Sequence, residues 1–378
     1  MKKFKAGIFT KQYGYKGFKP SLLEFPFEWE NDVIIKLLSE ANTMLGELNV
    51  YSELVPDVNF FIEMHKVKEA TNSTRIEGTQ TNVGEAVLKR ANIAPEKRDD
   101  WQEVRNYIEA LNYAIDRLDK LPLSIRLLKE IHAILLSGVR GEHKTPGEVR
   151  ISQNWIGGAS IDSAVFVPPH PNELPELLGN LELFWHDEKI TLPHLIRIAI
   201  GHYQFETIHP FLDGNGRIGR LLITLQLLHY GLLTKPVLYL SAFFEQHRGE
   251  YTDSLLHVST SNNIGQWLRF FLTGIIQTAK EGKETFVSIG KLREKYQIFV
   301  LQLGKRGKLA NQLLQYLYSN PIISPRDVEQ VLKITPATAN RLLKEMEKTG
   351  MLMERTGFSR NRLYELHEYL SLFQNNNR

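Results

Sequence analysis

The sequence predicts a mainly α-helical fold that carries one β-hairpin and is followed by a C-terminal winged helix-turn-helix domain. Three observations lead to this prediction. Apolar residues recur at spacings of three and four along most of the chain after residue 30, a glycine- and proline-rich stretch at 147–171 breaks this period, and the chain beyond residue 304 reads as three short helices and a strand pair. A length of 378 residues is expected to form two or three domains.

The composition is that of an ordinary globular protein, and it excludes several kinds of site. Hydrophobic residues make up 42% and charged residues 24% of the chain, and the formal net charge is only +3. Such a small net charge argues against a protein built mainly to neutralise nucleic-acid phosphates. Because the chain has no cysteine, disulfides, thiolate zinc sites and cysteine nucleophiles are excluded, and a reducing, cytoplasmic location is expected.

No membrane segment is expected. The most apolar window, residues 221–240, contains His229, Lys235 and Pro236 and directly follows a pair of arginines. These residues interrupt the window well before it reaches the length of a membrane span. The window is therefore predicted to be a buried helix followed by a strand or a turn.

The first part of the chain is expected to be an extended arm followed by helices. Residues 1–30 are rich in Gly, Phe, Tyr and Pro and show no sustained period, so they are predicted to pack on the body as an arm.

The predicted domains are 1–100 for the arm and first helices, 101–285 for a helical domain, and 286–378 for the winged helix. The helical patterns are marked by apolar residues on one face of each helix, namely Val33, Ile34, Leu37, Leu38 and Leu45, then Trp101, Val104, Ile108, Leu111 and Ile115, then Leu127, Leu128, Ile131, Ile134 and Leu135, then Leu195, Ile198, Ala199, His202 and Phe205.

Residues 147–171 are predicted to form a β-hairpin. Two short runs of β-branched and aromatic residues flank a glycine-rich polar turn, and Pro168 and Pro169 end the second run. Nothing else in the sequence is an obvious cover for the edges of such a hairpin. It is therefore a candidate for accepting an added strand from a partner protein, and the alternative is a lid that packs on the body.

The C-terminal region reads as a winged helix. Ser324-Pro325 and Thr335-Pro336 each combine an N-cap residue with a proline at the first helical position, Gly350 ends the second of these helices, and a strand pair follows. Acidic residues interleave with the basic ones, so protein contacts or dimerisation are expected in preference to duplex DNA, while DNA binding and a homodimer both stay open. The basic residues are Arg341, Lys344, Lys348, Arg355, Arg360 and Arg362, and the acidic ones are Glu345, Glu347 and Glu354.

The most informative segment is residues 209–220, which read His-Pro-Phe-Leu-Asp-Gly-Asn-Gly-Arg-Ile-Gly-Arg. Gly214-Asn215-Gly216 can turn successive N–H groups toward one point, and a helix that starts at residue 216 or 217 adds its positive end. Arg217 and Arg220 stand three apart on the first turn, so both can reach phosphate groups on the same side. The segment is therefore predicted to bind a polyphosphate.

Two further residues of this segment supply chemistry. Asp213 offers a hard oxygen ligand beside the phosphates, which suits Mg²⁺ held by one carboxylate, substrate oxygens and waters. His209 stands where the preceding helix ends, and an imidazole is well suited to accept a proton from an attacking hydroxyl. Phe211 is predicted to anchor the loop in the core.

The segment resembles the signature of the Fic family, His-x-Phe-x-Asp/Glu-Gly-Asn-Gly-Arg-x-x-Arg, at every defined position. The resemblance covers roughly residues 60–260 and implies the all-helical Fic fold. It also implies a protein adenylyltransferase that transfers AMP from Mg·ATP to a Ser, Thr or Tyr hydroxyl of a target protein and of itself. The hairpin at 147–171 resembles the family's flap, which docks the target segment by strand addition.

The resemblance also implies roles for individual residues. His209 is then the general base, Asp213 holds Mg²⁺, and Arg217 and Arg220 grip the β- and γ-phosphates. A weaker likeness, Arg248-x-x-Tyr251, resembles the stretch near the adenine pocket. The nucleotide-binding residues implied in this way are Gly214, Asn215, Gly216, Arg217, Ile218, Gly219, Arg220, Ile156, Gly157 and Tyr251.

A second motif lies upstream, where Ser73-Thr74-Arg75-Ile76-Glu77-Gly78 closes a helical pattern at about 61–78. A carboxylate in the last turn of a helix is unfavourable because the helix dipole prefers a basic residue there. This departure from the usual preference indicates that Glu77 has a functional partner. The motif resembles the family's inhibitory sequence Ser/Thr-x-x-x-Glu-Gly/Asn. By that resemblance Glu77, with Ser73 on the same face, pairs with Arg220 and blocks the productive position of the γ-phosphate.

Two alternatives stay open. Some relatives of this kind transfer a different phosphate-containing group or remove AMP, and the motif alone does not separate these reactions. An alternative of another class is a nucleotide-sensing winged-helix regulator that binds DNA.

Overall fold

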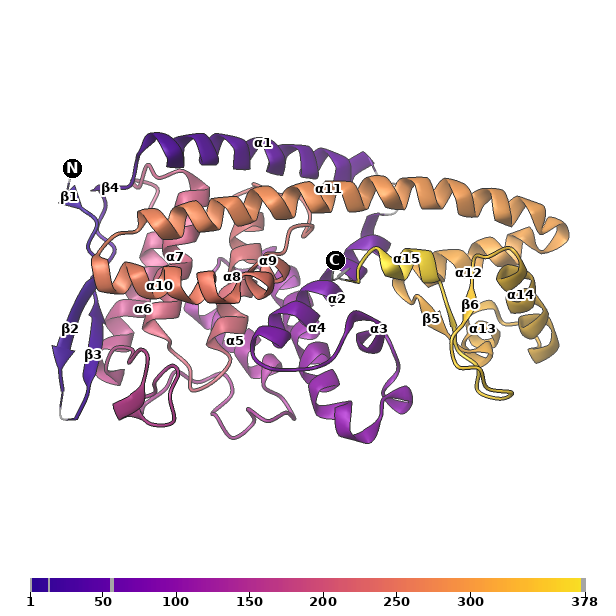
Figure 1. Ribbon diagram of the computed structural model, residues 1–378, viewed down its shortest axis with the longest axis horizontal. Helices are drawn as coiled ribbons and strands as arrows, with labels where there is room; N and C mark the ends of the chain where they lie inside the picture. Colours follow the sequence, from indigo (N-terminus) through magenta and orange to yellow (C-terminus); the bar gives the residue numbers. More distant parts are fainter. Residues whose placement is uncertain (1, 13, 55–57, 375–378) are drawn as a thin grey trace.

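The computed structural model describes residues 2–12, 14–54 and 58–374, and it confirms the predicted fold class. Figure 1 shows a helical body, a small N-terminal β-hairpin at one end and a winged helix at the other. The 38-residue helix α11 (Gly265–Gln302) runs along the molecule, packs against α1 (Asp32–Leu54) and continues to the winged helix. The predicted domain boundary at 285/286 falls inside this continuous helix.

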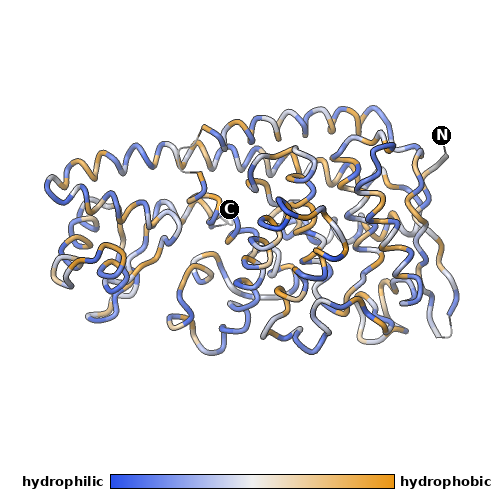
Figure 2. The backbone as a smooth tube through the Cα atoms, turned by 180° about the vertical axis from the view of Figure 1, so that it is seen from behind, coloured by the Kyte–Doolittle hydropathy of each residue, from blue (hydrophilic) through white to orange (hydrophobic). Residues whose placement is uncertain are grey.

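Two helices form the centre of the body, α7 (His194–Ile208) and α8 (Asn215–His229), and they pack against each other. Nearly all of their side chains are buried, which is the pattern of a helix enclosed on every side. Figure 2 shows hydrophobic residues recurring along the helices around them. These helices are α2 (Val58–Ile76), α4 (Arg98–Leu118), α5 (Ile125–Leu135), α6 (Leu174–His186), α9 (Ser241–Gln246) and α10 (Arg248–Ser261).

Short elements connect these helices. They are α3 (Val83–Ala86) and the 3₁₀ turns η1 (Arg90–Asn92), η2 (Pro95–Lys97), η3 (Ile161–Ser163), η4 (Pro171–Glu173) and η5 (Gly304–Arg306). The apolar window at 221–240 is the buried second half of α8 followed by a turn. Among the described residues, no helix combines the length and the hydropathy that crossing a membrane would require.

The N-terminal arm is extended, as predicted, but it also folds back on itself. β2 (Gly7–Lys11) pairs antiparallel with β3 (Lys16–Pro20), and β1 (Lys2–Lys3) pairs parallel with β4 (Phe27–Glu28). Phe18 of β3 is buried, and its N–H donates to the carbonyl of Val167 at 2.8 Å. The arm is therefore joined by a backbone hydrogen bond to the end of the segment that was predicted to be a hairpin.

The predicted hairpin at 147–171 is corrected by the structure to a loop with a single β-bridge between Ile156 and Phe166. The bridge consists of two hydrogen bonds, from the Ile156 N–H to the Phe166 carbonyl and from the Phe166 N–H to the Ile156 carbonyl. The second run does not continue as a strand because Ser160 caps the turn η3. Short polar side chains that bond their own backbone in this way compete with a strand ladder.

The winged helix contains the predicted helices and wing, and one further strand. α12 (Gly307–Ser319), α13 (Pro325–Leu332) and α14 (Pro336–Lys348) are followed by the wing strands β6 (Met353–Glu354) and β7 (Tyr364–Glu365). The added strand β5 (Ile322–Ile323) pairs with β7, so the sheet order is β5-β7-β6. The helix α15 (His367–Ser371) closes the domain.

The start of α13 provides a test of this domain's stability. The Ser324 hydroxyl accepts from the Asp327 N–H at 3.3 Å, and the Ser324 N–H donates to the Asp327 carboxylate at 2.8 Å, which forms a capping box. Replacing Ser324→Ala removes one of these two bonds and should lower the free energy of unfolding by about 1 kcal/mol in urea denaturation. Ser39→Ala, the same change at an exposed position in the middle of α1, should not lower it; equal losses in both variants would contradict the capping role.

Candidate active site

His209 stands at the end of α7 in a left-handed conformation (φ 49°), and its N–H closes the helix on the Phe205 carbonyl. Its Nδ1 lies 3.2 Å from the Glu206 carbonyl oxygen, which can only accept, so Nδ1 carries the proton and Nε2 is the basic nitrogen. Burial lowers the pKa of His209 to about 4. At neutral pH the imidazole is therefore uncharged and able to accept a proton.

The loop that carries His209 is held from the 147–171 segment. The Arg150 guanidinium donates to the carbonyls of His209 at 2.9 Å and Pro169 at 2.6 Å, and the Asn154 amide donates to the Phe211 carbonyl at 2.9 Å. Arg150 is almost fully buried, and burial lowers its pKa to about 10. The segment and the loop therefore form one rigid unit around His209.

Phe211 anchors the loop in the core, as the sequence predicts. Its ring stacks on His132 with centroids 3.9 Å apart and an interplanar angle of 11°. The Gly147 N–H donates to Nδ1 of His132, so Nε2–H of that ring donates to the Asp213 carbonyl at 3.0 Å. Burial lowers the pKa of His132 to about 4, so this ring stays neutral while it hydrogen-bonds to both Gly147 and Asp213.

The turn into α8 differs in detail from the expectation. Gly214 is the N-cap with φ 78°, which favours glycine, and the helix begins at Asn215, one residue earlier than predicted. The Asn215 side chain bonds both the N–H and the carbonyl of Phe211 at 2.8 Å, and the residue also lines the cavity beside the turn. Asn215 therefore shapes the turn, and the helix N-terminus remains as the anion-attracting feature.

A cavity of about 410 Å³ opens beside these residues, within the usual size range for small-molecule sites. Its polar lining includes His209, Asp213, Gly216 and Arg220. Aromatic and aliphatic side chains supply the apolar lining, namely Ile156, Val165, Phe166, Tyr251, Leu255 and Leu256. The cavity therefore suits a molecule with a charged part and a flat, apolar part.

Arg220 projects from α8 onto the end of α2. Its Nε donates to the Ser73 hydroxyl at 2.9 Å, and its Nη2 donates to the Ser73 carbonyl at 2.9 Å and to Glu77 Oε1 at 2.6 Å. Although burial opposes the charged form, the Arg220 charge and hydrogen bond hold the pKa of Glu77 below its ordinary value. Glu77 and Arg220 are therefore an ionised pair in the wall of the cavity.

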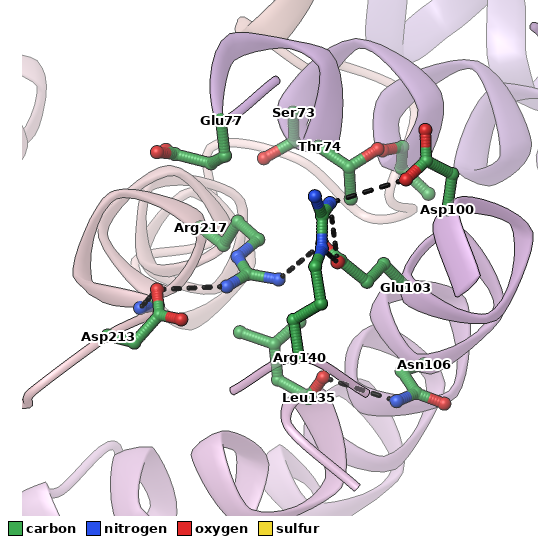
Figure 3. A network of polar contacts seen from close by, with 12 residues as sticks. Ser73, Thr74, Glu77, Asp100, Glu103, Asn106, Leu135, Arg140, Asp213 and Arg217 are labelled. Atoms are coloured by element: carbon green, nitrogen blue, oxygen red, sulfur yellow. Dashed lines mark hydrogen bonds and ion pairs between the residues drawn. The ribbon is translucent and has the colours of Figure 1, made fainter. Parts of the chain in front are cut away.

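Arg217 does not project into the cavity, contrary to the expectation that both arginines face phosphates. Its guanidinium is buried between Glu103 and Asp213, each at 3.2 Å, and Arg140 contacts Glu103 from the other side at 2.8 Å (Figure 3). Two carboxylates hold this guanidinium through charge-assisted bonds. Arg217 therefore orients Asp213 from behind the cavity wall.

Asp213 offers one carboxylate oxygen to a cation. Its Oδ1 accepts from the Gly214 N–H at 2.6 Å and from Arg217, whereas Oδ2 lies next to Gly141. No group of three or more acidic or histidine side chains that could hold a metal occurs within residues 2–12, 14–54 and 58–374. The donor set fits Mg²⁺ only where a substrate's phosphate oxygens and waters complete the coordination, which is a usual arrangement for this ion.

The remaining predicted nucleotide contacts fall into two groups. Ile156 and Tyr251 line the cavity, and the Tyr251 hydroxyl lies 2.8 Å from His202 Nε2. Ile218 is fully buried in the core, and the Gly219 carbonyl accepts from His202 Nδ1 at 3.1 Å. Gly157, with φ +68°, packs against Val165 rather than facing the cavity, because it forms the turn of the loop.

Four functional residues carried no recognisable signal in the sequence. Arg150, Glu103 and Glu69 act through contacts between distant segments; Glu69 accepts from the Tyr107 and Ser241 hydroxyls beneath Arg220. Glu206 lines the cavity, and burial raises its pKa to about 7. In the described part of the chain, Glu206 Oε1 has no hydrogen-bond partner. For Glu206, the position three residues before His209 could have indicated a place near the site, because both residues lie near the end of α7.

Similarity to known proteins agrees with this geometry. Residues 35–116 match the Fic/DOC family N-terminal model, 122–227 match the Fic/DOC family model, and 308–353 match the model for winged helix-turn-helix DNA-binding domains. The protein adenylyltransferase Fic of Culex quinquefasciatus is 34% identical over 149 residues, 39% of this chain and 27% of that protein. The protein of the same name from Aedes aegypti is 30% identical over 212 residues, 54% of this chain and 39% of its own length. The chain thus spans only about a third of the length of these relatives.

Two solved structures share the fold. A Fic family protein from Desulfovibrio desulfuricans G20 superposes with a TM-score of 0.59 at 20% identity, over 91% of this chain and 98% of that one. Fic-1 (residues 134–508) from C. elegans superposes with a TM-score of 0.52 at 23% identity, over 69% and 74% of the two chains. Residues 35–227 therefore carry the Fic/DOC N-terminal and Fic/DOC family regions on a Fic fold, and a winged helix-turn-helix domain follows them.

Proposed function

We propose that the protein is a protein adenylyltransferase, which transfers AMP from ATP to a Ser, Thr or Tyr hydroxyl of a target protein and of itself. One observation carries this proposal: the unprotonated Nε2 of His209 lies on the wall of a cavity that also holds the positive end of α8 and Arg220. The cavity thus combines a base with an anion site. The names of the relatives described above support the same activity.

The reaction follows from the polar and apolar lining of the cavity. The adenine fits against the apolar lining, which includes Ile156 and Tyr251, and the triphosphate lies toward the N-terminus of α8. The target hydroxyl oxygen attacks the α-phosphorus, its proton passes to Nε2 of His209, and the bond to the oxygen that bridges the α- and β-phosphates breaks. Pyrophosphate leaves with the electron pair of that bond, and AMP remains on the target.

Asp213 would hold Mg²⁺ through Oδ2, with Arg217 fixing the other oxygen. When bound, the ion neutralises charge on the phosphates. The protein's own contribution is orientation, because the carboxylate is locked by the Gly214 N–H and by Arg217, which is itself held by Glu103. Such prior positioning is a large part of catalysis in phosphoryl transfer.

The Glu77–Arg220 pair restrains this reaction in our proposal. Arg220 supplies the cation on the cavity wall that a γ-phosphate would need, and Glu77 and Ser73 occupy its donors Nε and Nη2. A carboxylate and a phosphate compete for the same guanidinium because both bind its forked donors. ATP would therefore bind productively only after Glu77 moves away.

The target is proposed to dock on the 147–171 segment beside the cavity. The exposed side chains of Trp155, Ile156 and Val165 give this segment an apolar surface, and the single bridge leaves backbone groups free for an added strand. Arg150 ties the segment to the His209 carbonyl, so a docked hydroxyl would be held in register with the base.

A second candidate function is duplex DNA binding by the winged helix. On α14, Arg341, Lys344 and Lys348 share the exposed face, while Glu345 turns inward and pairs with Arg306. Glu354 accepts from the N–H groups of Thr356 and Gly357 and so shapes the wing. Two of the three interleaved acidic residues, Glu345 and Glu354, thus form bonds within the domain. The structure therefore favours DNA binding more than the sequence pattern alone does.

The main test uses Glu77→Gly protein with ATP labelled at the α- or, separately, the γ-phosphate. Because Glu77 no longer competes with the phosphate for Arg220, self-labelling from α-labelled ATP should rise by roughly tenfold or more. A tenfold rise corresponds to a free energy of about 1.4 kcal/mol. Glu77→Gln, which keeps an oxygen acceptor without the charge, should lie in between. Adding His209→Ala should abolish transfer while leaving ATP binding measurable by calorimetry.

The label identifies the reaction. Label from the α position alone corresponds to nucleotidyl transfer, whereas label from the γ position would identify transfer of another phosphate group and overturn the proposal. Equal labelling by wild-type and Glu77→Gly protein would show that Glu77 does not restrain the site.

Glu206 predicts a pH dependence of ATP binding. Its buried carboxyl, with a pKa of about 7, is neutral below this pH and negative above it, where it attracts Arg220 and repels the triphosphate. In Glu77→Gly protein the pKa of Glu206 falls somewhat, because Glu77 contributes to raising it. The KM for ATP should therefore rise about threefold to tenfold between pH 5.5 and 8, on the order of 1 kcal/mol.

The control for this prediction is Glu206→Gln in the same background, which should show no such rise beyond the ionisation of ATP itself. The pKa of His209, about 4, keeps this base neutral over the whole range, so kcat should stay nearly constant. Identical pH profiles of KM with and without Glu206→Gln would refute the role of this carboxyl.

DNA binding is tested by retention on mixed-sequence duplex DNA at rising salt. Three exposed basic side chains on α14 and those of the wing predict a log–log slope of roughly −3 to −5, close to one per phosphate contact. Arg341→Glu with Lys344→Glu should abolish retention. The paired change Lys11→Glu with Lys36→Glu, which alters the charge equally at exposed positions outside the winged helix, should not. Equal retention of both double variants would show that α14 does not contact DNA.

A further inference from the structure

The winged helix packs directly on the helix that ends at Glu77. Phe61 of α2 packs its ring against Tyr318 of α12 and Tyr369 of α15, with centroids 5.1 and 6.0 Å apart. One turn further along, His65 contacts Phe373 at 5.1 Å. Figure 1 shows α15 lying beside α2, between the body and the rest of the winged helix. The start of α2 is therefore set by the position of the winged helix.

The chain that follows Glu77 is held by the same domain. Lys89 forms an ion pair with Asp327, in the first turn of α13. The guanidinium of Arg355, at the base of the wing, lies against Gly84 in α3 while it pairs with Glu365 at 3.4 Å. Glu77 thus stands between two anchors, and both belong to the winged helix.

α2 can transmit a displacement from these anchors to Arg220. Phe61 and His65 lie in its first two turns and Ser73 in its last, so one rigid helix of about 12 to 18 Å joins the aromatic contacts to the Arg220 contacts. Arg220 requires a close approach, since its bonds to Ser73 and Glu77 are 2.6 to 2.9 Å long. A shift of about 1 Å along α2 would exceed the hydrogen-bond range.

The anchors include cations that DNA phosphates would compete for. Lys89 lies next to the N-terminus of α13, the helix that crosses the DNA backbone in this class of domain, and Arg355 begins the wing. A phosphate near either side chain would draw it away from Asp327 or from its place against Gly84. DNA would therefore bind the released state more tightly than the anchored state. Such a difference in affinity is what allows a ligand to shift the equilibrium between two states.

We propose that the winged helix controls the Glu77 restraint, and that duplex DNA bound by α14 and the wing loosens the two anchors and releases Glu77 from Arg220. This proposal rests on the proposed adenylyltransferase function and on the DNA-binding candidate. In the DNA-free protein the winged helix holds α2 against Arg220. In the DNA-bound protein Arg220 is available to ATP.

The experiment measures self-labelling from α-labelled ATP with and without mixed-sequence duplex DNA at low salt. DNA should raise labelling of the wild-type protein by roughly fivefold or more, the lower end of typical allosteric couplings, and should leave Glu77→Gly protein unchanged. The Arg341→Glu, Lys344→Glu variant should label at the basal rate and not respond to DNA.

Lys89→Ala gives an independent test without DNA. Because this side chain is exposed, the change should not affect folding, which a thermal melt would verify. It removes the Asp327 anchor and should raise basal labelling only where Glu77 is present. Equal rises in the wild-type and Glu77→Gly backgrounds would place the effect outside the restraint and overturn the proposal.

A readout that does not depend on chemistry separates this proposal from the proposed function. Amide hydrogen exchange of residues 73–78 should accelerate when DNA binds wild-type protein, whether or not AMP is transferred. Absence of label in Glu77→Gly protein would instead contradict adenylyl transfer itself. DNA that binds without changing exchange at 73–78, or protein that is not retained on DNA at all, would overturn the regulatory proposal.

Discussion

The buried charge of Arg220 is the constraint on which the rest of the site depends. Its guanidinium lies inside the body, and an unpaired charge in that position would cost several kcal/mol. Ser73 and Glu77 supply the bonds that make this burial tolerable, and the carboxyl groups of Glu69 and Glu206 lie nearby. The end of α2 therefore lies against the start of α8, while α2 also packs on α4 and α9.

The same constraint shows what the proposed restraint would require. A carboxylate and a terminal phosphate both present oxygens that accept from the forked donors of an arginine. In the proposed exchange of Glu77 for a phosphate, Arg220 would therefore stay paired. The ion pairs of Arg217 with Glu103 and Asp213 are separate from Arg220, and they orient the Asp213 carboxylate independently of it (Figure 3).

The sequence predicted those parts of the site that follow from local pattern. Residues 209–220 carry their chemistry within one loop and one helical turn, and the resemblance linked Glu77 to Arg220 across 143 residues. Arg150 and Glu103 could not be found in this way, because their roles arise from contacts made only after folding. The bonds of the Asn215 amide to Phe211 were not predicted either, because nothing in the sequence shows that these two residues meet across the turn. The hairpin was overpredicted because a capped 3₁₀ turn has the same composition as a strand end.

The proposed control of Glu77 would act away from the cavity. α11 joins the body to the winged helix as one uninterrupted helix, so the two parts have a defined spacing. The aromatic contacts at Phe61 and His65 and the ion pair of Lys89 join the winged helix to α2 and to the chain that follows it. In our proposal these contacts set how far α2 reaches toward Arg220. Because hydrogen bonds weaken steeply beyond about 3.2 Å, a small change at these contacts is enough to separate Glu77 from Arg220. A restraint built from one short ion pair at the end of a long helix is therefore sensitive to whatever holds the other end of that helix.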